Sequence, residues 1–333
     1  MFSKRSCRSG SEAFALLLVA SSSTAAEPFP TRDQNPLLAG FGLPTPMRSR
    51  LPAAGAWSLA ADLNWGSTAL RQGNGREELI VDAETREARF RIEHTLTDRI
   101  GVQLQIPYRY TGAGSLDGFI DRWHDVFGLP EGSRPDLPDD QMLIAYERLG
   151  TTAFYLDSAA AIDTSLSGLA DISVDLGLAL RQTSSSALTA WLSVKLPSGD
   201  ADELTGSGAV DVSLVLAGEH RLSDHWSAYG QAAITRLGEG ELLSNQQRSI
   251  VWSGFAGIGW QAWRGLELKL QVDAHTAAFD DIDLDYFGDA VILTVGGDYR
   301  FASGWRLDAG VSEDIAVETS PDVVFVFGLR RDF

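Results

Sequence analysis

Strict alternation of apolar and polar residues is the feature that most constrains the fold of this chain. In residues 56–65, AWSLAADLNW, Leu63 falls on one face of an extended strand and Asp62 on the other. The same period of two recurs in residues 88–96, 102–110, 171–181, 188–196, 211–219, 266–275 and 305–311. Most of these segments run for about nine to eleven residues, the length of a tilted membrane strand, whereas strands of soluble sandwiches are usually shorter. The pattern predicts an all-β protein, an antiparallel transmembrane β-barrel.

Aromatic residues gather near the ends of these segments. They include Trp57, Trp65, Tyr108, Tyr110, Trp226, Trp252, Trp260, Tyr299, Phe301 and Trp305. Aromatic girdles of this kind mark the two interfaces of a membrane barrel. After residue 26, no apolar run approaches the roughly 20 residues that a membrane helix needs. Both observations favour strands as the spanning elements.

Two kinds of connection alternate along the chain. Tight turns are expected at residues 96–99, 149–151, 183–186, 221–225, 263–265 and 302–304, and long polar linkers lie between them. Short turns at one end and long loops at the other are typical of outer-membrane barrels. The pattern predicts about fourteen strands in one domain, residues 56–333. The number falls to twelve if the irregular segment 153–162, AFYLDSAAAI, is not a barrel strand.

The residues before the first strand divide into two parts. A basic start, the apolar run 13–20 and a stretch of small residues predict a cleavable secretory signal peptide over residues 1–26. The following segment, residues 27–55, contains TRDQNPLLAGFGLP at 31–44 and is too apolar for a plain linker. It is expected either to fold into the lumen as a plug or to lie on the periplasmic rim as a tail, and the sequence leaves both open.

The last strand carries an assembly signal. In VVFVFGLRRDF the apolar residues alternate up to a terminal aromatic residue, on one face of a strand: Val323, Phe325, Phe327, Leu329 and Phe333. Arg331 interrupts the pattern. This ending resembles the C-terminal signal read by the outer-membrane assembly machinery, which we therefore expect to be a partner. The expected location is the outer membrane of a Gram-negative bacterium, in contact with its lipids and lipopolysaccharide.

The formal charge of −18 excludes one class of partner and leaves another open. Such an acidic chain would be repelled by the phosphates of nucleic acid, so no nucleic-acid binding is expected. The loop 279–289, FDDIDLDYFGD, contains five aspartates, and oxygen ligands at close spacing suit Ca²⁺. It lacks the glycine and glutamate of an EF-hand loop, so a solvated acidic loop is the favoured interpretation. Divalent cations at acidic loops remain the alternative, and no cofactor or dedicated metal site is expected.

The polar faces of the strands predict which charges line the lumen. The expected lumen-facing residues are Arg89, Arg91, Glu93, Arg109, Asp171, Asp175, Arg181, Lys195 and Lys269. In a channel, such a mixed set of charges would control selectivity.

The stretch 117–134, DGFIDRWHDVFGLPEGSR, predicts one short amphipathic helix in a long loop. Asp117 is expected to cap it and Gly128 to end it in the left-handed conformation. The apolar residues Phe119, Ile120, Trp123 and Phe127 fall on one face, with His124 at its margin. This face predicts a helix that packs on an apolar surface, which could be the barrel wall, a lumen surface or the membrane interface. A plug or gate of the lumen is the favoured interpretation. Catalysis by His124 is the weaker alternative, because no nucleophile motif accompanies it.

Several stretches together resemble a known family. They are residues 31–44, 117–134, 167–176 (SGLADISVDL) and 312–333 (SEDIAVETSPDVVFVFGLRRDF), and the likeness covers nearly the whole chain after the signal peptide. The family is the proteobacterial domain of unknown function 3187, and the resemblance implies an exported outer-membrane β-barrel without supplying catalytic residues. We therefore expect a passive channel or transporter for small solutes. The alternative is a non-transporting barrel, either a lipid-modifying enzyme or a structural protein.

Overall fold

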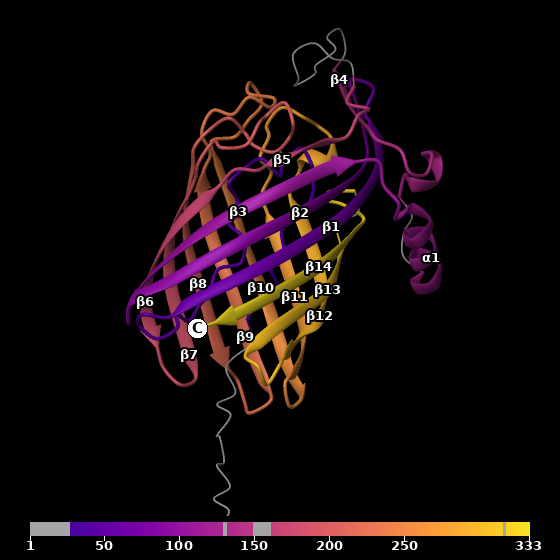
Figure 1. Ribbon diagram of the computed structural model, residues 1–333. Coiled ribbons are helices and arrows are strands. Elements are labelled where there is room, and N and C mark those ends of the chain that lie inside the picture. The colour runs from indigo at the N-terminus through magenta and orange to yellow at the C-terminus, as the bar shows by residue number, and fades with distance from the viewer. Residues whose placement is uncertain (1–26, 129–131, 149–160, 316–317) are drawn as a thin grey trace, which may run out of the picture.

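A computed structural model describes residues 27–128, 132–148, 161–315 and 318–333 (Figure 1). Its strands are β1 (Trp57–Gly73), β2 (Glu77–Thr97), β3 (Ile100–Gly112), β4 (Leu143–Arg148), β5 (Leu166–Leu169), β6 (Ser173–Gln182), β7 (Ser186–Lys195), β8 (Asp211–Arg221), β9 (Trp226–Arg236), β10 (Ile250–Trp263), β11 (Leu266–His275), β12 (Ala290–Arg300), β13 (Trp305–Asp314) and β14 (Val323–Asp332). The helical elements are α1 (Asp117–Phe127), η1 (Arg134–Asp136) and η2 (Asp285–Phe287).

Twelve of these strands close into an antiparallel barrel. β1 pairs with β2 on one side and with β14 on the other, so the first and last strands seal the ring. β4 pairs only with the far end of β2, and β5 only with the far end of β3, so both stand outside the ring. The predicted antiparallel barrel is confirmed, with the smaller of the two expected strand numbers. The doubtful segment 153–162 lies mostly outside the described residues.

The alternation in the sequence appears in the barrel as an apolar outer face and a polar inner face. On β1, Leu63 is 36% exposed whereas its neighbour Asp62 is only 4% exposed. Large apolar side chains are exposed around the outside of the ring, among them Leu59, Phe90, Leu176, Leu214, Trp252, Leu270, Val295 and Phe327. A water-soluble fold buries such side chains, whereas a membrane barrel turns them toward lipid.

The two ends of the barrel differ in their connections. Tight turns join β2 to β3, β6 to β7, β8 to β9, β10 to β11 and β12 to β13, and we call this side the turn end. The longer connections lie on the opposite side, the loop end, together with β4 and β5 (Figure 1). The chain terminus at Phe333 lies at the turn end, where its backbone bonds to Trp57.

The helix α1 lies outside the barrel, beside the loop end (Figure 1). The indole of Trp123 donates to the carboxylate of Glu313, 2.8 Å away, and the ring of Phe119 packs edge-on against Phe325. Both partners alternate with lumen-facing residues and therefore point outward from their strands. No helix in the described part of the chain is long and apolar enough to cross a membrane.

Candidate functional site: the filled lumen

Residues 27–52, which we call the lumen segment, run through the inside of the barrel. Near the turn end, the carbonyl oxygen of Glu27 accepts from Nζ of Lys269 at 3.0 Å. The segment reaches the loop end at Asn35, whose side-chain amide donates to the carbonyl of Tyr286. It then returns to the turn end, where the backbone N–H of Leu51 donates to Gln182 at 2.8 Å. The segment is therefore a hairpin-shaped insertion that spans the lumen twice.

Side chains of the barrel wall bond the backbone of the lumen segment along its whole length. Gln271 Oε1 accepts from the N–H of Phe29 at 2.9 Å, and Gln231 Oε1 accepts from the N–H of Met47 at 2.8 Å. The indole of Trp191 donates to the carbonyl of Arg48 at 2.8 Å. An irregular segment leaves its peptide groups without ladder partners, so these polar side chains are needed to satisfy them inside the barrel.

Ion pairs hold the lumen segment near the turn end. Arg48 is 7% exposed and makes a two-pronged contact with Asp332, at 2.8 and 2.9 Å, while its Nη1 lies 3.6 Å from Glu93. The carboxylate of Glu27 pairs with Arg330 and lies 3.4 Å from Arg306. Charges that line the wall are thus neutralised by charges on the inserted segment.

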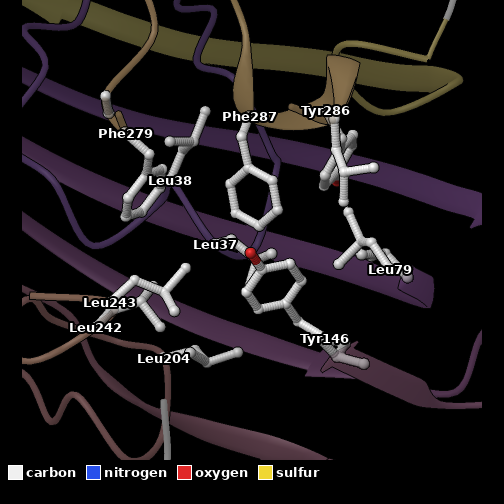
Figure 2. Packing of buried hydrophobic residues seen from close by; sticks show 14 of the residues in the cluster. Leu37, Leu38, Leu79, Tyr146, Leu204, Leu242, Leu243, Phe279, Tyr286 and Phe287 are labelled. Carbon is white, nitrogen blue, oxygen red and sulfur yellow. The ribbon is translucent and has the colours of Figure 1, made fainter. Parts of the chain in front are cut away.

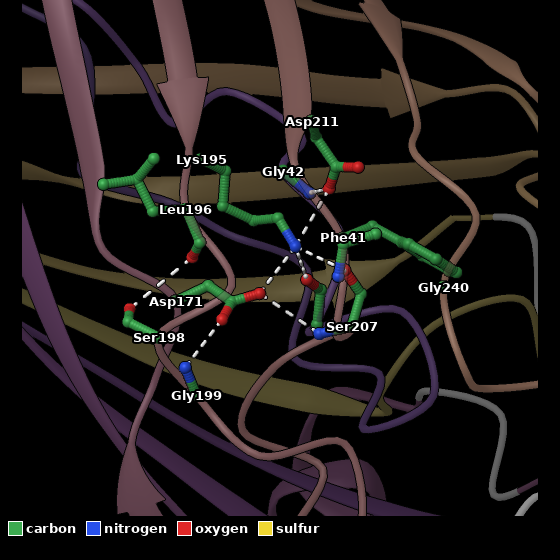
Figure 3. Close-up of polar contacts among 12 residues, drawn as sticks. Phe41, Gly42, Asp171, Lys195, Leu196, Ser198, Gly199, Ser207, Asp211 and Gly240 are labelled. Carbon is green, nitrogen blue, oxygen red and sulfur yellow. Dashed lines mark hydrogen bonds and ion pairs between the residues drawn. The ribbon is translucent and has the colours of Figure 1, made fainter.

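A second charged group lies near the loop end, where the segment turns. Figure 3 shows Nζ of Lys195 between Asp171, Asp211, Ser207 and the backbone of the segment. Its distances are 2.5 Å to Asp171, 3.1 Å to Asp211 and 3.0 Å to the carbonyl of Gly40. Arg109 donates to the carbonyl of Ala39 at 2.7 Å. Cationic side chains from β3 and β7 therefore bind the backbone where the lumen segment turns.

An apolar cluster covers the lumen at the loop end, and we call it the mouth cluster (Figure 2). It joins the turn of the lumen segment to the upper strands and the long loops: Leu37, Leu38, Phe41, Leu70, Leu79, Val81, Tyr146, Leu204, Leu242, Leu243, Phe279, Tyr286 and Phe287. Phe41 packs against Phe279 with ring centroids 5.5 Å apart. Because these side chains come from at least five separate stretches of chain, they close the mouth by side-chain packing.

The structure places most of the predicted lumen charges on the inner face. Arg89, Glu93, Arg109, Asp175, Lys195 and Lys269 are buried there, Asp171 lies just before β6, and Arg91 pairs with Asp62 at 2.6 Å. The prediction for Arg181 is wrong: it is exposed and lies opposite Leu188 on the outer face. A bulge between Ala179 and Arg181 shifts the alternation by one residue, so the neighbouring Gln182 points inward instead.

The predicted role of α1 as a plug or gate is wrong, because the helix packs on the outer face of β13 and β14. Asp117 does not cap it, since its carboxylate accepts from Arg134 at 2.6 Å and from the N–H of Asp140 at 2.7 Å. Gly128 ends the helix at φ 66°, as predicted. Ile120 and His124 form the buried side, whereas Phe119 is half-exposed, so His124 is not at the margin. Phe127 is the last residue of the helix.

A charged group anchors α1 outside the ring. Arg134 donates to Asp117 and, at 2.7 Å, to Asp322, which follows the loop after β13. Burial raises the pKa of Asp322 to about 6, although the nearby Arg134 opposes the shift. This group links the helix to the wall rather than to the lumen.

The remaining predicted residues lie on the outer face of β14 or in the loops, and Val323 among them is buried. The residues of the C-terminal signal, Val323, Phe325, Phe327, Leu329 and Phe333, share the outer face of β14 and the chain end. Their recognition by the assembly machinery stays a prediction. In the loop 279–289 the aspartates spread apart: Asp280 pairs with Arg248, and Asp289 accepts from the N–H of Ala277. Among the residues that the structure describes, no three acidic, histidine or cysteine side chains are placed to hold a metal ion.

Sequence reasoning missed the contacts between the segment and the wall, and the pair of His275 and Asp33 is one of them. Nε2 of His275 lies 2.9 Å from the carboxylate of Asp33, inside a cavity of about 70 Å³. The alternation of β11 could have placed His275 inward, but the path of residues 27–52 carries no such signal.

Comparisons with known proteins agree with this architecture. The family model described as protein of unknown function (DUF3187) matches residues 8–333. No curated protein matches the chain significantly. Among solved structures, the COG4313 outer membrane channel from Pseudomonas putida F1 is similar with a TM-score of 0.58 and 15% identity, covering 86% of this chain and 99% of that chain. At this identity the likeness shows the outer-membrane β-barrel fold.

Two further channels resemble the chain more loosely. The KdgM porin has a TM-score of 0.43 at 8% identity, covering 83% of this chain and 99% of that chain. The Pseudomonas putida toluene transporter TodX has a TM-score of 0.37 at 11% identity, covering 92% of this chain and 94% of that chain. Scores this low carry no argument about function.

Proposed function

Because the chain belongs to the family described as protein of unknown function (DUF3187), which names no activity, we propose its function from the geometry of the lumen. The protein is a passive channel for small solutes in the outer membrane, and residues 27–52 hold it shut. A cleavable leader over residues 1–26 exports it, and the alternating apolar residues that end at Phe333 present it to the assembly machinery. Its outer face meets the membrane lipids and lipopolysaccharide.

The observation that carries the proposal is the contrast between the wall and the lumen segment. The wall strands are joined by continuous backbone ladders, whereas the segment is joined to the wall by side chains. The segment can therefore leave while every strand keeps its hydrogen bonds. The wall behind it is rich in both acids and bases, which suits passage of hydrated polar solutes.

One feature argues against a lipid-modifying enzyme centred on His124. His124 is 3% exposed on the buried side of α1, so a lipid could reach it only if the helix were displaced.

Single-channel recording in planar bilayers tests the proposal directly. Full-length protein should show rare openings, and a variant lacking residues 28–50 should show steady conductance. Folding of each variant is checked by its heat-modifiable migration on gels. A deletion variant that folds and inserts but passes no current would contradict the proposal.

A disulfide provides a test without deletion. A Cβ built on Gly66 of β1 would lie 3.1 Å from the Cβ of Gln34 in the lumen segment. Disulfides need about 3.5–4.5 Å between these atoms, so a small shift suffices. The Gln34→Cys/Gly66→Cys double variant should show no openings when oxidised and should recover them on reduction. Gln34→Cys alone, under the same oxidant, is the control.

A further inference from the structure

Four cationic side chains line one small cavity near the loop end, although the chain as a whole carries a charge of −18. The cavity measures about 20 Å³. Its cations are Arg32 from the lumen segment, Arg89 from β2, Arg109 from β3 and Lys195 from β7. Asp171 is the acid that lines it with them, and hydroxyl groups of Thr45, Ser173 and Ser193 complete the polar wall.

The acids around this cavity do not balance its cations. Glu87 pairs with Arg89 and, at 2.5 Å, with Arg109, and lies 3.9 Å from Arg32. Lys195 is shared by Asp171 and Asp211. Asp175, the next acid along β6, accepts instead from the amides of two glutamines, Gln103 and Gln105. Within ion-pair distance, three carboxylates thus serve four cations, and Asp175 acts on Arg89 only from farther away, so direct pairing leaves an excess of one positive charge.

Two of the guanidinium groups also have unused donors. Nη1 of Arg89 and Nε of Arg109 are buried and have no hydrogen-bond partner among the described residues. Both side chains are 2% exposed. An arginine carries five N–H groups, and a buried N–H without a partner is costly, so these donors indicate a missing acceptor.

We propose that this cavity binds one small monovalent anion, such as a halide ion, between the lumen segment and the wall. An anion supplies both the missing charge and the missing acceptor. The volume exceeds the roughly 10–15 Å³ that a cavity needs to hold one water, so it suits a single small ion better than a larger organic anion. Because Arg32 belongs to the lumen segment and the other three cations belong to the wall, the bound anion ties the segment in place.

Thermal unfolding of the full-length protein in detergent measures this binding. At constant ionic strength, replacing gluconate by chloride or bromide should raise the midpoint of unfolding in a saturable manner. In Arg89→Gln, which removes the excess charge, the halide concentration for half-maximal stabilisation should rise at least tenfold. Arg300→Gln removes the same charge from the turn end of β12 and should leave the halide response unchanged.

A direct measurement covers the case in which Arg89→Gln does not fold. Crystals of the unaltered protein grown in bromide should show anomalous scattering from an ion within hydrogen-bond distance of Nη1 of Arg89. Equal midpoints in halide and gluconate, or a cavity that holds only water in bromide crystals, would overturn the proposal. Neither readout depends on conductance, so the outcome is independent of whether the protein is a channel.

Discussion

Replacing Arg48 by methionine should loosen the lumen segment more than any other single loss of charge at the turn end. The change removes the cation that faces Glu93, Asp332 and, at 3.9 Å, Glu27. The carboxylate of Glu93 is almost fully buried, so it would be left without its cation in the lumen. Asp332 is about half exposed, and solvent would screen it after the change.

The magnitude follows from the burial of each partner. Removing one member of a buried ion pair costs about 3–5 kcal/mol, whereas an exposed pair contributes about 0–1 kcal/mol. Only the contact with Glu93 is fully buried, so the free energy that holds the segment in its docked position should fall by about 3 kcal/mol. Since about 1.4 kcal/mol is a factor of ten, the undocked population should rise about a hundredfold.

Hydrogen exchange of the lumen segment in detergent measures this population. Backbone amides such as those of Met47 and Leu51, which donate to wall glutamines, should exchange about a hundredfold faster in Arg48→Met. Adding Glu93→Gln removes the stranded charge and should restore part of the protection. Arg71→Gln is the control, because both members of its pair with Glu78 are about half exposed and the pair should contribute little. Equal exchange in Arg48→Met and Arg71→Gln would refute the reasoning.

Three further predictions address the mouth cluster, the helix and the bulge. Phe41→Ala should cost about 3–5 kcal/mol of docking, because the ring is buried against Phe279, and bilayer recordings should show more frequent openings. Trp123→Phe removes the indole donor to Glu313 and should speed exchange in α1 while leaving conductance unchanged, whereas a change in conductance would return the helix to a gating role. Arg181→Gln should leave the ion selectivity of the channel lacking residues 28–50 unaltered, while Arg109→Gln should shift it toward cations, as reversal potentials would show.

The sequence predicted the wall well because each strand reports its own environment. Alternation at Asp62 and Leu63 reflects a local rule, in which one face meets lipid and the other meets the lumen. That rule fails where a β-bulge interrupts the regular alternation of the strand. Nothing in the residues between Ala179 and Arg181 announces the bulge, so the predicted orientation of Arg181 was inverted.

The placement of α1 was predicted wrongly for a different reason. An amphipathic pattern shows that a helix packs on an apolar surface, but a membrane barrel has its largest apolar surface on the outside. The outward-facing Phe325 belongs to that surface. Arg134, which follows α1 in the same loop, donates to Asp322 nearby. The identity of the surface depends on loop length and on charges far apart in the chain, which periodicity does not encode.

The way in which the lumen segment is bound favours a channel that is closed at rest and can open and close repeatedly. Its buried Arg48 pairs with Glu93 and Asp332 of the wall, so the desolvation of this guanidinium is offset mainly in the docked position. The segment therefore docks in one defined position. Water can hydrate the same charge after release, which lowers the free energy needed to undock the segment. The segment also remains continuous with β1, and just before that strand the N–H of Gly55 donates to the carbonyl of Thr95 in β2 at 2.7 Å. A released segment thus stays at high effective concentration beside its own binding surface, which makes reclosure fast without any further partner.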